Sequence, residues 1–273
     1  NINKQEKKVY VLKTFFFRNL FFLTHKIRFL ISSTPDLDNS FFKRSKYNLT
    51  KYIYIQHSPL SLTKIYDEKA FLAFDAVQVV NIFQKKELMK INYLYKKKIK
   101  AFKSKYLFLD KKISQDASST KKKVLIAPTW HTNFYELNLH VKLKEIFNEK
   151  KIDYVLRPHP MSLKKKEISI EKLKKELINF DIDNELNFKN FSYLISDWSG
   201  IYVEFSIINK KFSFLINTKQ KIRNINSNKF SEVPLEVFAR NILGSTIEIE
   251  NLAQLNNLLK KKNLDNNSKI TKF

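Results

Sequence analysis

The stretch YLISDWSGIYVEF, which runs from Tyr193 to Phe205, decides the predicted fold. Its first residues, Tyr193–Ile195, are apolar and predict a short buried strand. The polar turn 196–200 follows, and then apolar side chains recur at i, i+4 and i+7 over residues 201–208, which is the spacing of one helix face. The stretch therefore predicts a strand, a turn and the start of a helix.

Two interpretations of this turn are open. The Ser199 hydroxyl can cap the helix by accepting a backbone N–H, and Gly200 is one of only two glycines in the chain, which indicates a tight turn or a close approach by another group. A strand, a polar turn and a helix N-terminus form a geometry that binds phosphate, because free N–H donors and the helix dipole point the same way. An ordinary, well-capped turn fits the same residues.

Outward from this stretch, apolar runs alternate with helical patterns, which is typical of a parallel, doubly wound α/β sheet. The expected strands are 124–130, 153–160, 211–217 and 245–250, and the expected helices are 136–149, 170–179 (with Leu173 and Leu177 one turn apart) and a last amphipathic helix over the leucines 252–259.

The first part of the chain has strands of its own. Residues 51–58, KYIYIQHS, alternate Tyr and Ile and predict a buried strand that places His57 at its carboxyl end. The polar stretch 113–123 is the best linker candidate. We therefore expect two α/β units, residues 1–118 and 119–273. The other elements expected in the first unit are strand-like runs at 8–12 and 26–33, a strand at 76–81, a helix at 84–95 and a short strand at 106–109.

Charge and composition limit the classes of partner. The chain carries a formal net charge of +25, spread over many short lysine runs, and this favours an anionic surface or substrate. Because arginine and aromatic residues do not form a combined patch, we expect no nucleic-acid partner. The absence of cysteine excludes disulfides and thiolate metal sites.

The most apolar early run, TFFFRNLFFL at 14–23, is interrupted by Arg18 and Asn19 and is too short to span a bilayer. We expect it to form a buried helix of the first unit. The alternative is a helix lying on a membrane surface, because basic residues flank it. The start of the sequence lacks the pattern of a signal peptide.

Polar side chains collect just after the predicted strands. The carboxyl ends of parallel strands meet at one rim of a sheet, where ligands bind in open α/β folds. A lone histidine after a strand is also compatible with a structural role. No metal-ligand spacing, Walker loop or G-x-S-x-G elbow is present, so we expect no metal and no cofactor. The candidate residues are His57, Thr129, His131, Arg157, His159, Ser196, Asp197 and Ser199.

Several ordered pieces of the chain resemble the CDP-glycerol:poly(glycerophosphate) glycerophosphotransferases, which build teichoic acids and related capsule polymers. The resemblance extends over roughly residues 50 to 260, and RPHP followed by SDWSG at this spacing is its most specific part. The pieces are YIQHSPLSLTKIY from Tyr54, FDAVQVVN from Phe74, VLIAPTW from Val124, LRPHP from Leu156, the stretch quoted first, KIRN from Lys221 and EVPLEVFARNILG from Glu232.

The resemblance implies a GT-B-like α/β fold, with two Rossmann-like domains whose parallel sheets face a central cleft. Residues 1–118 would then serve the acceptor and 119–273 the nucleotide donor. The implied reaction moves glycerol phosphate, or a similar polyol phosphate, from a CDP-activated donor to a hydroxyl of a cell-surface polymer or lipid-linked acceptor, and releases CMP. The implied location is the cytoplasmic face of the cell membrane, on an anionic surface.

The resemblance also implies roles for individual residues. His57 corresponds to the general base of the family, and His159 with Arg157 would hold the pyrophosphate. This chain has Ser58 where the family has glycine after the histidine, and the lysine that usually follows soon after is displaced to Lys64. The implied donor-binding and phosphate-binding residues are Thr129, Ser196, Asp197, Ser199 and Gly200.

Two other classes of function fit the sequence. One is a GT-B glycosyltransferase that uses a nucleotide sugar for surface polysaccharide. The other is a basic, non-enzymatic binding protein at a membrane or nucleic acid, for which the charge alone would matter and the histidines would not.

Overall fold

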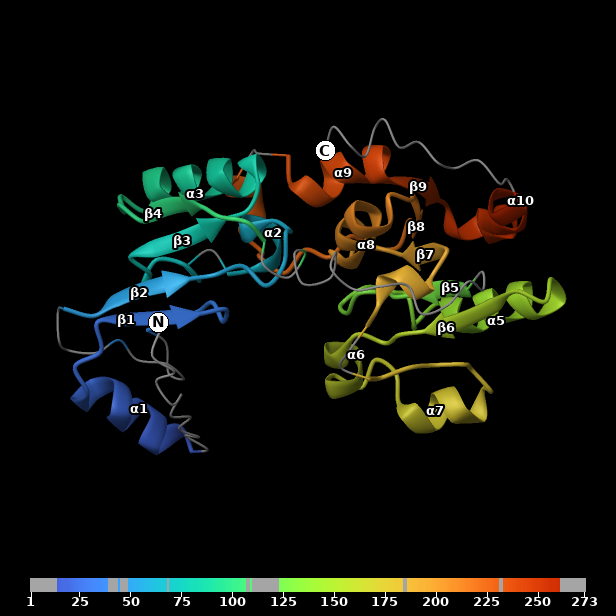
Figure 1. Ribbon diagram of the computed structural model, residues 1–273, viewed down its shortest axis with the longest axis horizontal. Coiled ribbons are helices and arrows are strands. Elements are labelled where there is room, and N and C mark those ends of the chain that lie inside the picture. Colours follow the sequence, from blue (N-terminus) through green and yellow to red (C-terminus); the bar gives the residue numbers. More distant parts are fainter. Residues whose placement is uncertain are drawn as a thin grey trace, which may run out of the picture.

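The computed structural model describes residues 14–38, 44, 49–67, 69–106, 109, 123–183, 186–230 and 233–260. Within these residues the chain forms two sheets that lie side by side (Figure 1). Every strand pairing in both sheets is parallel, which confirms the predicted α/β class.

The first sheet has four strands in the order β1-β2-β3-β4. Helices α2 (Leu62–Ile65) and α3 (Ile82–Leu94) follow β2 and β3, so this unit has the alternation that parallel strands require. Buried residues of β2 and β3 pack with Leu88 and Ile91 of α3 in one core. The strands are β1 (Phe29–Ser32), β2 (Lys51–Tyr54), β3 (Ala76–Val79) and β4 (Lys100–Lys103).

The second sheet has five strands in the order β6-β5-β7-β8-β9. The quoted stretch forms the central strand β7 (Tyr193–Ser196) and helix α8 (Ile201–Asn209), as predicted. The chain order reverses beside β5, and the crevice at such a reversal is where open α/β sheets bind ligands. The remaining strands are β5 (Lys123–Ile126), β6 (Asp153–Leu156), β8 (Ser213–Ile216) and β9 (Gly244–Ile247).

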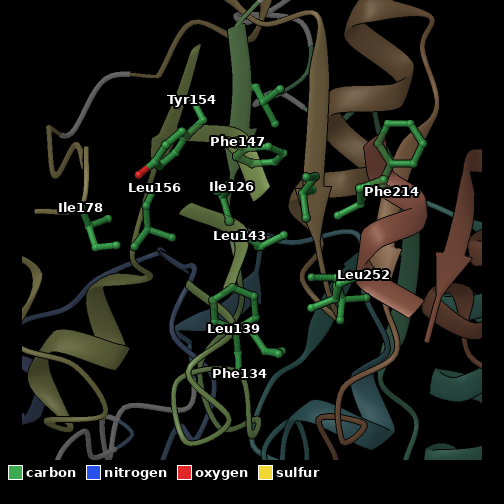
Figure 2. Packing of buried hydrophobic residues seen from close by; sticks show 14 of the residues in the cluster. Ile126, Phe134, Leu139, Leu143, Phe147, Tyr154, Leu156, Ile178, Phe214 and Leu252 are labelled. Atoms are coloured by element: carbon green, nitrogen blue, oxygen red, sulfur yellow. The ribbon is translucent and has the colours of Figure 1, made fainter. Parts of the chain in front are cut away.

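The second sheet is buried on both faces, which explains its nearly continuous apolar strands. In β5, Val124 and Ile126 belong to one core cluster, whereas Leu125 belongs to the cluster on the other face. Figure 2 shows the first of these clusters, in which α5 contributes Leu139 and Leu143. The helices of this unit are α5 (Leu139–Glu149), α6 (Pro160–Lys164), α7 (Ile170–Lys175), α9 (Leu235–Leu243) and α10 (Leu255–Lys260), with short 3-10 turns at Phe188–Asn190, Ser227–Lys229 and Ile249–Gln254.

One side-chain prediction in this unit is wrong. Leu173 is buried in α7, but Leu177 lies beyond the end of that helix, with a positive φ of 52° and 78% of its surface exposed. The helix ends before a second turn can bring the two leucines onto one face.

Helix α1 (Phe15–Thr24) forms where the Phe-rich run predicted it, beneath β1 in the view of Figure 1. The expectation of burial is wrong for Phe16, Phe17 and Leu20 of this helix, which are 67%, 60% and 44% exposed. This helix has too few residues to cross a bilayer, and among the described residues the other helices are also too short or too polar to do so.

The chain returns to the first unit after β8. The backbone N–H groups of Arg223 and Asn224 donate to the Lys64 carbonyl, and Asn224 Nδ2 donates to the Thr63 carbonyl. Phe230 is buried in the core of the first sheet. The two sheets are therefore linked by contacts well beyond the connection between β4 and β5.

Several expectations lie outside the described residues. They are the boundary at 118/119, almost all of the linker 113–123, the run 8–12 and most of the short strand 106–109.

Candidate active site

A cavity of about 460 Å³ lies between the two units, at the carboxyl ends of their strands. Both predicted histidines line it, His57 from the first unit and His159 from the second. The other lining residues are Ser58, Leu60, Ile65, Tyr66, Ala127, Pro128, Thr129, Trp130, Arg157, Pro158, Pro160, Met161, Ser199, Gly200, Ile201, Glu204, Lys221 and Arg223.

His57 is held between tyrosines just beyond β2. Its Nδ1 lies 3.2 Å from the Tyr54 hydroxyl and its Nε2 lies 3.2 Å from the Tyr66 hydroxyl. The Tyr106 hydroxyl also donates to the His57 backbone carbonyl, at 2.9 Å. Burial and the nearby Lys221 lower the pKa of His57, against a hydrogen bond with the Ser33 backbone that acts in the opposite direction. The imidazole is therefore neutral at pH 7 and can accept a proton.

His159 has one nitrogen committed to the backbone. It is the N-cap of α6, and its Nδ1 accepts the Met161 N–H at 3.0 Å. In the neutral ring the proton then resides on Nε2, which makes Nε2–H the free donor. Burial, followed by the charge of Lys221, lowers the pKa of His159 to about 4. His159 can therefore donate a hydrogen bond to an anion in the cavity at neutral pH.

Two cations of the cavity were not among the predicted site residues. Lys221 Nζ and Arg223 Cζ lie 4.8 and 4.7 Å from the centre of the Trp130 ring. Lys221 Nζ also donates to Thr129 Oγ1 at 3.0 Å. Burial lowers the pKa of Lys221 to about 8, and Arg223 adds to this effect. Their one sequence signal is the KIRN segment, which carried the family resemblance without an assigned role.

Ser196 and Asp197 lie behind the cavity wall and are fully buried. Ser196 Oγ donates to the Ala127 carbonyl at 2.6 Å. The Asp197 carboxylate accepts the Thr129 N–H at 2.8 Å and the Thr132 hydroxyl at 3.0 Å. Burial raises the pKa of Asp197 to about 6, although these hydrogen bonds and Lys221 lower it in part. Both side chains fix the loop that carries Thr129.

Ser199 and Gly200 line the cavity at the N-terminus of α8. Ser199 Oγ accepts the Ile201 N–H at a long 3.4 Å. Gly200 has φ −63°, so its backbone does not require glycine. A Cβ there would lie 3.0 Å from Ser58 Oγ and 3.1 Å from Leu60 Cγ, both in the first unit. Of the two reasons considered for this glycine, close approach by another segment is the one that applies.

Two predicted site residues form their hydrogen bonds with groups outside the cavity. Arg157 lines the cavity, but its guanidinium forms an ion pair with Asp181 at 3.1 Å and donates to the Asp183 carbonyl. His131 does not line the cavity; it has φ 65°, and its N–H donates to Glu167 Oε1 at 2.8 Å.

The displaced lysine of the first unit also lies elsewhere. Lys64 does not line the cavity, and its Nζ contacts the Ser227 carbonyl at 3.4 Å. In the part of the chain that the structure describes, histidine and carboxylate side chains do not gather in groups of three or more that could hold a metal ion.

Two parallel α/β sheets that share a cationic cavity at the carboxyl ends of their strands define a GT-B-like protein. Solved structures agree with this fold. The chain is similar to the wall teichoic acid polymerase TagF in a structure obtained after a 30-minute soak with CDPG, with a TM-score of 0.56 at 16% identity over 90% of this chain and 66% of that one. A 15-minute soak of the same polymerase gives a TM-score of 0.51 at 16% identity over 90% of this chain and 65% of that one.

Sequence comparison adds a protein family to which the chain is similar. Residues 101–223 match the model of the CDP-Glycerol:Poly(glycerophosphate) glycerophosphotransferase family. The chain is also 27% identical over 179 residues to the teichoic acid glycerol-phosphate primase of Bacillus subtilis (strain 168), covering 63% of this chain and 46% of the primase. It thus spans about half the length of this curated relative. In both sequence comparisons the chain is therefore similar to proteins of CDP-glycerol-dependent glycerophosphate transfer and teichoic acid priming.

Proposed function

We propose that this protein transfers glycerol phosphate from CDP-glycerol to a hydroxyl of a polymeric or lipid-linked acceptor in teichoic acid synthesis, and releases CMP. One observation carries the proposal: a single cavity joins a neutral histidine of the first unit to Lys221, Arg223, His159 and a helix N-terminus of the second. Phosphoryl transfer depends mainly on positioning and on neutralising charge, and these groups supply both.

The diphosphate of the donor is bound by groups of the second unit. Lys221 and Arg223 neutralise its charge, His159 Nε2–H donates to an oxygen, and the N–H groups at the start of α8 beside Ser199 do the same. Arg157 acts mainly through the segment that it holds at Asp181. Accordingly, we assign the nucleotide donor to residues 119–273.

The acceptor is bound on the side of residues 1–118, where His57 is the general base. The acceptor hydroxyl loses its proton to His57. Its oxygen then bonds to the phosphorus that carries glycerol, and the bond from this phosphorus to the bridging oxygen breaks, so that CMP leaves with the electron pair. The buried residues Ser196, Asp197 and Thr129 position Lys221 and the loop beside it.

A donor screen tests this function. The purified protein, a glycerol-phosphate acceptor and CDP-glycerol should yield CMP and an acceptor longer by one or more glycerol phosphates, measured by chromatography and mass spectrometry. His57→Ala should abolish turnover while leaving CDP-glycerol binding in place. Turnover of a UDP- or CMP-linked sugar, with CDP-glycerol left intact, would contradict the proposal and favour a glycosyltransferase.

We also propose that the protein binds peripherally to the anionic inner face of the cell membrane. Helix α1 exposes Phe16, Phe17 and Leu20, and the exposed basic residues Lys26 and Arg28 follow it in the sequence, a combination that suits an interfacial helix. Flotation with anionic liposomes should show binding that salt weakens, and Phe16→Ser with Phe17→Ser should reduce it. Failure to float at low salt, or equal binding to neutral liposomes, would count against this location.

A further inference from the structure

His57 lies between the hydroxyl groups of two tyrosines. Tyr54 Oη lies 3.2 Å from His57 Nδ1, and Tyr66 Oη lies 3.2 Å from His57 Nε2. Tyr54 is completely buried, whereas Tyr66 lines the cavity beside His57. Each tyrosine ring is fixed by edge-to-face contact with Phe71.

The neutral imidazole of His57 carries one proton, so one ring nitrogen donates a hydrogen bond and the other accepts one. In the tautomer with the proton on Nδ1, Nδ1–H donates to the Tyr54 hydroxyl oxygen. The lone pair of Nε2 then accepts the proton of Tyr66. The Tyr66 hydroxyl oxygen can at the same time accept a hydrogen bond from a group in the cavity.

We propose that Tyr66 is a catalytic proton relay between the acceptor hydroxyl and His57, an inference that rests on the proposed function. A histidine that acts as a base would present its Nε2 atom to the substrate. Here the Tyr66 hydroxyl lies against Nε2 and lines the cavity, so the acceptor hydroxyl contacts Tyr66 Oη before it can reach His57 Nε2. Tyr54 holds the imidazole in the tautomer that the relay needs.

The relay moves two protons and leaves Tyr66 unchanged. As the acceptor oxygen bonds to phosphorus, its O–H bond breaks and the proton passes to Tyr66 Oη. The original Tyr66 O–H bond breaks at the same time, and that proton bonds to His57 Nε2. His57 becomes an imidazolium, CMP departs with the electron pair of the broken P–O bond, and the imidazolium then returns its proton to solvent or to the CMP phosphate.

The surroundings of Tyr66 and His57 keep both side chains in the protonation states that the relay requires. Burial raises the pKa of Tyr66, so the phenol is protonated at neutral pH. The groups that face His57 are Tyr54, Tyr66, Lys221 and the Ser33 backbone, while Arg223 and Glu236 act on Tyr66. Glu204 reaches the His57 backbone through Tyr106.

The test compares Tyr66→Phe with the wild type in CDP-glycerol turnover and in a histidine NMR titration. Loss of the relay should lower kcat by about 100-fold, the usual contribution of a positioned proton-transfer group, with the KM for CDP-glycerol unchanged. Without the Tyr66 donor, the neutral form of His57 loses a hydrogen bond, so the pKa of His57 should rise. His57→Ala with Tyr66→Phe should be no slower than His57→Ala alone.

Tyr135→Phe is the matched control. Among the described residues its buried hydroxyl has no hydrogen-bond partner and lies outside the cavity lining, so this variant should keep the wild-type kcat.

A Tyr66→Phe protein with wild-type kcat, or with an unshifted His57 pKa, overturns the relay while the proposed function stands. A wild-type protein that leaves CDP-glycerol intact overturns the proposed function and the relay with it, and the NMR titration still tests the hydrogen bond between Tyr66 and His57. Tyr54→Phe, which keeps the core packing, should make Nε2-protonated His57 visible by ¹⁵N shifts.

Discussion

At the residue scale, the two nitrogens of His159 have separate tasks. Nδ1 caps α6 through the Met161 N–H, and Nε2–H is available to the cavity. Asn can cap a helix as well as His does here, but its side chain is too short to replace Nε2.

Substitution at His159 should separate these tasks. His159→Ala should lose about 1 kcal/mol of stability, the usual value of a cap, and His159→Asn should keep the wild-type melting temperature. Both should lose most turnover of CDP-glycerol. Thermal melts and steady-state kinetics on the same samples check this, and an active His159→Asn enzyme would show that Nε2 does not contact the donor.

Lys221 should contribute mainly to donor binding. A hydrogen bond to a charged group is worth about 1.5–3 kcal/mol, so Lys221→Met should raise the KM for CDP-glycerol roughly 10- to 150-fold. Lys219, two residues away and exposed, does not line the cavity, and Lys219→Met is the control that should leave KM unchanged. Equal effects of the two substitutions would indicate a general loss of charge instead.

Some of the predicted site residues line the cavity together, and other lining residues were not predicted, for a physical reason. His57, Thr129, His159, Ser199 and Gly200 follow strands, and parallel strands bring their carboxyl ends to one rim, so the chain order is enough to gather them. The missed groups Tyr66, Lys221 and Arg223 lie in irregular segments, which carry no periodic pattern. Tertiary contacts alone bring these segments to the cavity.

At the scale of elements, the two glycines should respond differently to a methyl group. A Cβ at Gly244 would lie 2.5 Å from Leu215 Cδ1 and 2.9 Å from the Ser213 carbonyl oxygen, inside the second sheet. Gly244→Ala should therefore cost about 1–3 kcal/mol from overpacking. Gly200→Ala presses on Ser58 and Leu60 across the cavity, so it should reduce turnover with little loss of stability.

Denaturant unfolding and kinetics on both variants test this contrast. If Gly200→Ala destabilises as much as Gly244→Ala and keeps full activity, the close approach at Gly200 serves packing only.

Several elements with a clear pattern were predictable, whereas others were not, among them the nine-residue helix α9. The apolar strands β5, β7 and β8 and the helices α3, α5 and α8 follow from periodicity. Strand β4, KAFK, was not predicted, because its exposed lysines hide the strand pattern. Helices α2 and α6 have four and five residues, too few for a helical period to show.

At the scale of the whole molecule, a buried carboxylate joins the two sheets. Glu236 of α9 is 3% exposed, and its Oε2 accepts the Ser61 N–H at 3.1 Å in the first unit. Burial raises the pKa of Glu236 to about 7, with a contribution from the nearby Glu87. The folded protein therefore holds this proton more tightly than the unfolded chain does.

Glu236 should make the protein less stable as pH rises. The stabilisation from its proton is complete below its usual pKa of 4.5 and is lost as pH passes through about 7. The total is on the order of 3 kcal/mol. Glu236→Gln should flatten the melting temperature between pH 5 and pH 8, values that bracket this range, whereas the exposed Glu145→Gln should not. An unchanged slope in Glu236→Gln would assign the pH dependence to other groups.

The return of the chain into the first sheet has a consequence for how the polypeptide can be divided. Asn224 and Phe230 anchor a late segment to the early half through hydrogen bonds and burial. After cleavage by a protease between the halves, the two fragments should stay associated. Neither fragment would have a complete hydrophobic core by itself. Reconstitution from two separately made pieces should succeed only when the early piece can recapture that late segment.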